Sequence, residues 1–278
     1  MIESVTAEVS PVIRRNNVTV SGRAEGPVML FAHGYGCDQD MWRRLVPYFS
    51  GNYRLVLFDN VGAGRSDADA YDREKYGSLD GYAADLLEIC EAMDLRDVIL
   101  VAHSVSAMVA VIAAAQEPDR FSRLVLVAPS PRYTNDSADG YTGGFSSEDI
   151  EGLLASLDSN YFAWAEALAP MAMANPEVPE LSEELRSSFC RTNPSIARHF
   201  ARVTFLSDTR PMLERVSTDC LILQCSDDLL APVEVGSYVH QHLGRSTLVH
   251  LQATGHCPHV SAPEDTARAI LRYLASSP

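Results

Sequence analysis

Short runs of almost purely apolar residues constrain the fold of this chain more than any other feature. Residues 28–32 read Val-Met-Leu-Phe-Ala, and residues 98–101 and 124–127 are equally apolar. A strand with one face in solvent alternates polar and apolar residues, whereas a parallel strand covered by helices on both faces is apolar throughout. Because helical patterns separate these runs, the chain is predicted to form an α/β fold with a doubly wound, mostly parallel sheet.

Eight strands are expected in this sheet. Three further runs, at 54–58, 220–223 and 248–251, continue the series along the chain. Two short β-rich stretches near the beginning, at 12–13 and 18–20, are expected to pair as a hairpin and to supply the remaining two strands.

The region from about 133 to 208 interrupts this alternation. It contains no convincing strand but has four sets of apolar residues at helical spacing, and Pro176, Pro179 and Pro194 separate the later sets. Four short helices inserted between two strands are expected to form a cap over the body of the domain. The expected organisation is a first core part at 1–132, a helical cap at 133–210 and a second core part at 211–278.

Composition limits the partners of the protein. The 278 residues are 46% hydrophobic, which is enough for a large core, and the net charge of −15 repels nucleic-acid phosphates and anionic membranes. The longest strongly apolar run, 107–115, is too short to span a bilayer, and residues 1–6 show no export leader. The six cysteines form no CxxC pair, so we expect reduced thiols, a cytoplasmic location, and neither nucleic acid nor membrane as a partner.

Ser104 carries the most specific chemical signal. The apolar run at 98–101 ends just before it, and an alanine-rich helical segment begins directly after it. A tight strand-to-helix turn of this kind exposes the hydroxyl of a catalytic serine, usually in the pattern G-x-S-x-G. Ala102 and Ser106 replace both glycines here but are still small, so the steric requirement is met. The alternative is a serine that only caps an ordinary helix.

The dipeptide His33-Gly34 follows another apolar run. Glycine at this point lets the backbone turn so that an amide can face the nucleophile and stabilise a developing oxyanion. We assign the two donors to the backbone N–H groups of Tyr35 and Val105. A glycine turn without catalytic function is the alternative for this segment alone.

A general base is expected after the last strand, where a loop can place a histidine over the sheet edge that holds Ser104. His256 occupies that position, with His259 as its rival. A metal site built from these two histidines with Cys37 and Cys257 has no recognisable ligand spacing, so neither a metal nor a cofactor is expected.

The acid of a catalytic triad would lie between the serine and the histidine in sequence, at the end of a strand. Asp227 and Asp228 follow the apolar run at 220–223, and both are candidates. Its role would be to hold the imidazole in the correct tautomer and to stabilise the imidazolium. Three residue types in this order, each after a predicted strand, are far more specific than any one of them.

Several segments together resemble the RsbQ-like α/β-hydrolases, a group that includes a bacterial energy-stress regulator and the plant karrikin and strigolactone receptors. The resemblance covers nearly the whole chain and is carried by residues 33–39, 79–83, 103–108, 224–228 and 255–259.

The resemblance implies an α/β-hydrolase fold with a four-helix cap over an apolar pocket. It implies Ser104 as the nucleophile, His256 as the base, and the backbone of Tyr35 and Val105 as the oxyanion donors. It also favours Asp228 over Asp227, because the family's acid directly precedes a short apolar run that ends in proline, here residues 229–232. The partner in the RsbQ case is phosphatase-like, and the motifs contain no partner surface.

Two functions from different classes agree with these residues. The first is a serine hydrolase that cleaves a small apolar ester or lactone through an acyl-enzyme intermediate. The second is a ligand sensor with slow hydrolysis whose cap is recognised by a partner protein. A C–C bond hydrolase is a weaker third reading. The side chains expected to line the pocket are Tyr35, Met108, Tyr161, Trp164, Met171, Phe200 and Phe205.

Overall fold

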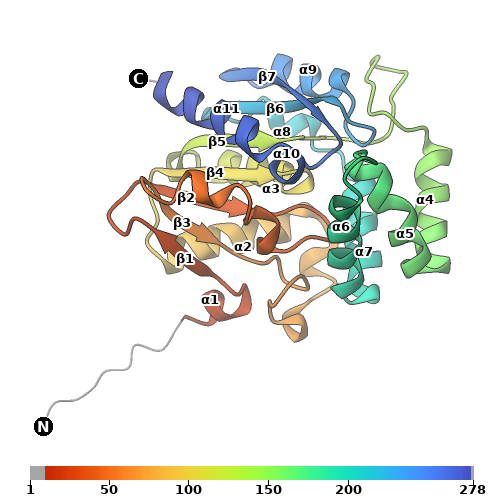
Figure 1. Ribbon diagram of the computed structural model, residues 1–278, viewed down its shortest axis with the longest axis horizontal. Helices are drawn as coiled ribbons and strands as arrows, with labels where there is room; N and C mark the ends of the chain where they lie inside the picture. Colours follow the sequence, from red (N-terminus) through yellow and green to blue (C-terminus); the bar gives the residue numbers. More distant parts are fainter. Residues whose placement is uncertain (1–9, 277–278) are drawn as a thin grey trace, which may run out of the picture.

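The computed structural model describes residues 10–276, so the amino-terminal residues examined for a leader lie outside the described part. A seven-stranded sheet with the order β1-β3-β2-β4-β5-β6-β7 forms its centre (Figure 1). β1 pairs antiparallel with β3, and every other neighbouring pair is parallel. The strands are β1 Thr19–Gly22, β2 Val28–Ala32, β3 Arg54–Leu57, β4 Val98–His103, β5 Phe121–Val127, β6 Asp219–Asp227 and β7 Ser246–Thr254.

The prediction of an eighth strand is wrong for the described residues. Residues 12–13 belong to the short helix α1, Pro11–Arg15, and not to a strand. Pro11 stands at the first helical position, where its fixed φ suits a helix and its missing N–H costs nothing. The expected hairpin is therefore absent, and β1 pairs with β3.

Helices cover both faces of the sheet, as the uninterrupted apolar strands require. Leu30 of β2 packs in the cluster that contains α2 (Leu79–Ala92) and α3 (Val105–Gln116), whereas Met29 packs on the opposite face with α11 (Pro263–Ser276). The remaining body helices are α8 Arg210–Leu213, α9 Val233–His242 and α10 Pro258–Ser261, with 3-10 helices at Gln39–Trp42, Val46–Tyr48, Ala68–Ala70, Lys75–Gly77 and Pro118–Arg120.

Four helices form the predicted cap beside one edge of the body (Figure 1, green to teal). Local sequence fixes where they begin: Ser146 and Asp149 form a capping box, Asn160 caps the second helix, and prolines open the third and fourth. The helices are α4 Ser147–Ser159, α5 Tyr161–Met173, α6 Pro179–Arg191 and α7 Pro194–Phe205. The domain boundaries at 132 and 210 stay a prediction.

The cap has an apolar core of its own, which continues into the body. Leu157, Trp164 and Leu185 lie in this cluster together with Cys37 and Cys257 of the body. The cap therefore closes directly over the carboxyl ends of β2 and β7. None of the helices described between residues 10 and 276 is both long and apolar enough to cross a membrane.

Candidate active site

Ser104 lies in the turn between β4 and α3 with φ 56° and ψ −127°. Residues other than glycine rarely adopt a positive backbone φ, and such backbone strain is typical of functional turns. Its side chain makes no capping hydrogen bond to the helix, which excludes the alternative of an ordinary capping serine. The strained turn presents the hydroxyl group at the carboxyl end of β4.

The two residues that replace the glycines of the G-x-S-x-G pattern are both accommodated in the turn around Ser104. Ala102 is fully buried, and the hydroxyl of the fully buried Ser106 donates a hydrogen bond to the carbonyl of His33. Ser106 therefore meets the steric requirement and also ties the start of α3 to the loop after β2. The sequence predicts the small size of residue 106 but not this hydrogen bond.

Gly34 allows the loop after β2 to approach Ser104 closely. A β-carbon at this position would lie 2.6 Å from Nδ1 of His103 and 3.2 Å from the β-carbon of Ser104. The next residue, Tyr35, is thereby brought beside the nucleophile turn. Val105 is the first residue of α3, so its N–H has no partner within the helix. Both positions suit the proposed oxyanion donors.

His256 connects the serine to the acid. Its Nε2 lies 2.7 Å from Oγ of Ser104, and its Nδ1 lies 2.8 Å from Oδ2 of Asp228. A carboxylate only accepts hydrogen bonds, so Nδ1 carries the proton and Nε2 is free to accept the serine proton. All three side chains are buried, with at most 5% of their residue surfaces exposed.

The structure distinguishes the two candidate acids. Oδ1 of Asp228 accepts hydrogen bonds from the backbone N–H groups of Leu230 and Ala231, at 2.9 and 3.1 Å. These bonds stabilise the ionised carboxylate and fix its orientation. The side chain of Asp227 is exposed. Its backbone carbonyl accepts a hydrogen bond from the N–H of Gly255, next to His256.

The family follows from the comparison with family models. Residues 29–269, which contain the complete triad, match the model of the alpha/beta hydrolase family. The chain belongs to the alpha/beta hydrolase family.

Relatives within this hydrolase family include plant receptors and esterases. The chain is 42% identical to karrikin insensitive 2 receptor IA of Petunia hybrida over 93% of each protein. It is 37% identical to strigolactone esterase D14 of Arabidopsis thaliana, over 95% of this chain and 97% of that protein. The solved structure of a hydrolase from Oleispira antarctica is 40% identical, with a TM-score of 0.93, and covers 96% of this chain and 97% of its own. The predicted resemblance to the karrikin and strigolactone receptors is confirmed.

Two further histidines of the hydrolase lie against the triad. Nε2 of His103 donates a hydrogen bond to the backbone carbonyl of His256 at 2.8 Å, and the ring of His259 lies 4.4 Å from that of His103. Burial lowers the pKa of His103 well below its usual value and lowers that of His259 to about 3, so both rings are neutral. His259, the rival general base, is not the histidine that contacts Ser104.

The loop that carries His256 is bound to the cap. Its backbone N–H donates to the carbonyl of Ala172 at 2.7 Å, and the side-chain amide of Asn175 donates to the carbonyl of Thr254 at 2.9 Å. The C-terminal end of α5 therefore holds the loop of the triad histidine. The sequence contained no signal for this link, because it depends on how two distant segments pack.

A cavity of about 40 Å³ lies beside the triad under the cap. Tyr35 and Phe205 line it, as predicted from the sequence. Tyr133 belongs to the same wall, and burial raises the pKa of its hydroxyl group to about 12. The full lining consists of Tyr35, Cys37, His103, Ser104, Tyr133, Leu168, Ala172, Leu185, Phe189, Thr204, Phe205, Leu230, His256 and Cys257.

The remaining residues predicted for the pocket are not among those that line it. Trp164 and Phe200 are buried behind the lining, with their rings 5.9 and 5.5 Å from that of Tyr35. Tyr161 stacks on Trp164, and Met108 is buried in the body core. The aromatic side chains of the cap helices therefore contribute more to the core of the cap than to the wall of the cavity.

Met171 was wrongly predicted to face the pocket. It is 51% exposed on α5, whereas Leu168 and Ala172 of the same helix line the cavity. Residues four apart share a helix face, and Met171 lies outside that stripe. Helical spacing alone did not reveal which apolar residues point inward.

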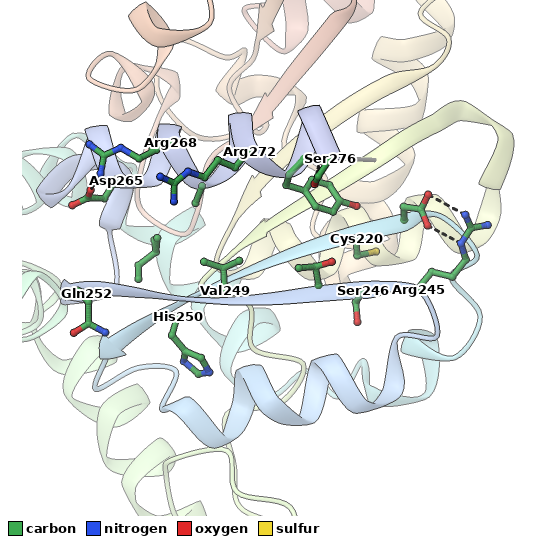
Figure 2. Close-up of a pocket in the computed structure, with 15 residues that line it drawn as sticks. Cys220, Arg245, Ser246, Val249, His250, Gln252, Asp265, Arg268, Arg272 and Ser276 are labelled. Atoms are coloured by element: carbon green, nitrogen blue, oxygen red, sulfur yellow. Dashed lines mark hydrogen bonds and ion pairs between the residues drawn. The ribbon is translucent and has the colours of Figure 1, made fainter. Parts of the chain in front are cut away.

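A larger hollow, about 940 Å³, lies between β7 and α11 (Figure 2). Figure 2 shows Val249 of β7 on the side of α11, where Arg268 and Arg272 lie, and His250 and Gln252 on the opposite side of the strand; all five border the hollow. No residue of the triad borders it, so its size does not make it the catalytic site.

Between residues 10 and 276, no group of three or more histidines, cysteines or carboxylates is arranged to hold an ion. Cys37 and Cys257, which line the cavity, are buried thiols whose pKa is raised by burial. Protonated thiols are poor ligands and poor nucleophiles. Ser104 is therefore the best nucleophile in this cavity.

Proposed function

We propose that this α/β-hydrolase cleaves a small apolar ester or lactone through an acyl-enzyme intermediate. The observation that carries the proposal is the continuous hydrogen-bonded chain from Ser104 through His256 to Asp228 at the strained turn after β4. An alcohol is a weak nucleophile at neutral pH, and an adjacent oriented base is what activates it.

In the first step, Oγ of Ser104 attacks the ester carbonyl carbon while its proton passes to Nε2 of His256. The negative charge on the carbonyl oxygen is stabilised by the N–H groups of Tyr35 and Val105. Asp228 stabilises the imidazolium and does not take the proton. His256 then protonates the departing alkoxide, which leaves Ser104 acylated.

In the second step, His256 removes a proton from water, and the resulting hydroxide attacks the acyl carbonyl carbon. The bond to Oγ of Ser104 breaks, the serine regains its proton from His256, and the carboxylic acid departs. These steps need no cofactor.

Unpaired thiols throughout the described residues support the expected cytoplasmic location.

The cavity beside the triad supports a compact, apolar substrate. Its walls are mostly apolar, and about 40 Å³ is far less than the roughly 300–1,000 Å³ of sites for drug-sized ligands. Compact acyl groups fit such a site best. Long polar chains would bury unpaired polar groups, each at a cost of about 1–3 kcal/mol.

A ligand sensor that signals to a partner protein is the second candidate. Relatives that are named receptors support it, as does the direct attachment of the cap to the loop of His256. A ligand that enlarges the small cavity would move α5 and the catalytic loop together. In this case hydrolysis would be slow, and a protein partner would recognise the altered cap.

A series of p-nitrophenyl esters with acyl chains from acetate to octanoate tests the proposed activity. We expect steady turnover to be highest for the shortest chains and to fall at least tenfold by octanoate, because long chains do not fit under the cap. A flat profile, or faster cleavage of charged esters, would contradict the closed apolar site.

The same measurement separates enzyme from sensor. An esterase releases many nitrophenolate molecules per protein molecule at a constant rate. A sensor of the kind described releases about one equivalent and then stops, because product or acyl-enzyme stays bound.

A further inference from the structure

Thr204 has an unsatisfied hydroxyl group at the active-site cavity. It is the next-to-last residue of α7, is 1% exposed, and lines the cavity together with Ser104. Its Oγ1 is buried and makes no hydrogen bond within the described part of the chain. Buried polar side chains are nearly always paired, so this group needs an explanation.

Other hydroxyl groups in helices of this protein are satisfied in the usual way. A threonine or serine inside a helix commonly donates to the carbonyl one turn earlier. Thr266 on α11 donates to Ala262 at 2.8 Å, and Ser237 on α9 donates to Val233 at 2.9 Å. The local helix therefore does not explain why Thr204 differs.

Thr204 lines the cavity from the cap side, among apolar residues. Much of the remaining wall on the cap side is apolar and includes Leu168, Leu185 and Phe189. Rotation about the Cα–Cβ bond exchanges the hydroxyl with the γ-methyl group, and no existing hydrogen bond opposes this rotation. A ligand oxygen can therefore recruit the hydroxyl without breaking any bond of the protein.

We propose that Thr204 is a specificity-determining residue that donates a hydrogen bond to a second oxygen of the substrate. This inference rests on the proposed ester hydrolysis at Ser104 and extends it. The preferred substrates are compact esters or lactones that carry an ether or carbonyl oxygen beyond the group that is cleaved. A site with a hydroxyl donor discriminates against an analogue in which that oxygen is replaced by a methylene group.

A matched pair of esters isolates this hydrogen bond. p-Nitrophenyl methoxyacetate and p-nitrophenyl butyrate have the same leaving group and chain length, but an ether oxygen in one replaces a methylene group in the other. The quantity to measure is the ratio of their kcat/KM values. Comparing that ratio between protein variants cancels the intrinsic reactivities of the two esters.

Thr204→Val keeps the shape of the side chain and removes the hydroxyl. We expect the methoxyacetate-to-butyrate ratio to fall about 3- to 10-fold, in the range of one net hydrogen bond. Thr204→Ser should retain the ratio, and Thr204→Ala, a second variant without the hydroxyl, should lower it as the valine does. Thermal unfolding is expected to be unchanged or shifted upward in Thr204→Val, because an unsatisfied buried hydroxyl is lost.

Thr218 supplies the control. Its Oγ1 is also buried and has no hydrogen-bond partner among residues 10–276, but Thr218 does not line the cavity. Thr218→Val should leave the ratio unchanged. An unchanged ratio in both hydroxyl-free Thr204 variants, or an equal fall in Thr218→Val, would overturn the inference while leaving the esterase proposal intact. Failure of the wild-type protein to cleave either ester would overturn the proposed function and the inference together.

Discussion

Asp227 and Asp228 are neighbours in the sequence but occupy different environments at the end of β6. Asp228 is buried and makes three hydrogen bonds, one of them to His256, whereas the side chain of Asp227 lies in solvent. The residue types after the strand make both aspartates candidates for the acid of the triad. Only the resemblance to known hydrolases favours Asp228. The direction of each side chain depends on the local turn, which residue types do not specify.

The difference predicts unequal effects of two identical substitutions. Asp228→Asn should lower kcat about 10⁴-fold, because an amide can present an N–H to Nδ1 and favour the wrong tautomer of His256. Asp227→Asn should change kcat less than about twofold, because the exposed carboxylate contacts no group of the triad. Steady-state kinetics on p-nitrophenyl acetate, with circular dichroism to confirm folding, measures both. Equal losses in the two variants would place the acid elsewhere.

At the scale of elements, α5 and the loop after β7 form one mechanical unit. Gly255 adopts φ +89°, and a β-carbon there would lie 2.0 Å from the carbonyl oxygen of Met173. The glycine is therefore needed both for its conformation and for the close contact between the loop and the cap helix. The adjacent His256 is positioned by the same contact, through its bond to Ala172.

Gly255→Ala should therefore impair catalysis through geometry. The added methyl group must push the loop and α5 apart, and a displacement of His256 by about 1 Å can cost on the order of 10²-fold in kcat. The expected result is a large fall in kcat with a smaller change in KM, together with a lower melting temperature.

Gly244→Ala is the matched control, because a β-carbon at Gly244 would meet no atom of the described residues within 4 Å. Its kcat and melting temperature should stay close to those of the wild-type protein. Wild-type kcat in Gly255→Ala would show that the cap does not position the catalytic loop.

For the whole molecule, the parts that the sequence predicted are those with strong local or periodic signals. The apolar strands, the four cap helices and the turn at Ser104 were predicted because each depends on residues close together in the chain. The parts that it missed depend on packing between distant segments. Met171 is the example within the cap, since its exposure depends on how α5 sits on the body. The strand expected at 12–13 is wrong for a different reason: a two-residue run is too short to distinguish a strand from a helix, and these residues lie in α1.

Folding brings three distant segments of the chain together and so activates one serine. Labelling with a fluorophosphonate, followed by peptide mass spectrometry, tests this activation most directly, because the reagent reacts only with a serine activated by a neighbouring base. We predict one label per molecule, on Ser104, in the folded protein and none in urea. Ser104→Ala should abolish labelling, and Ser106→Gly, which restores the common motif two residues away, should retain it. A label on another serine, or undiminished labelling of Ser104→Ala, would contradict the account.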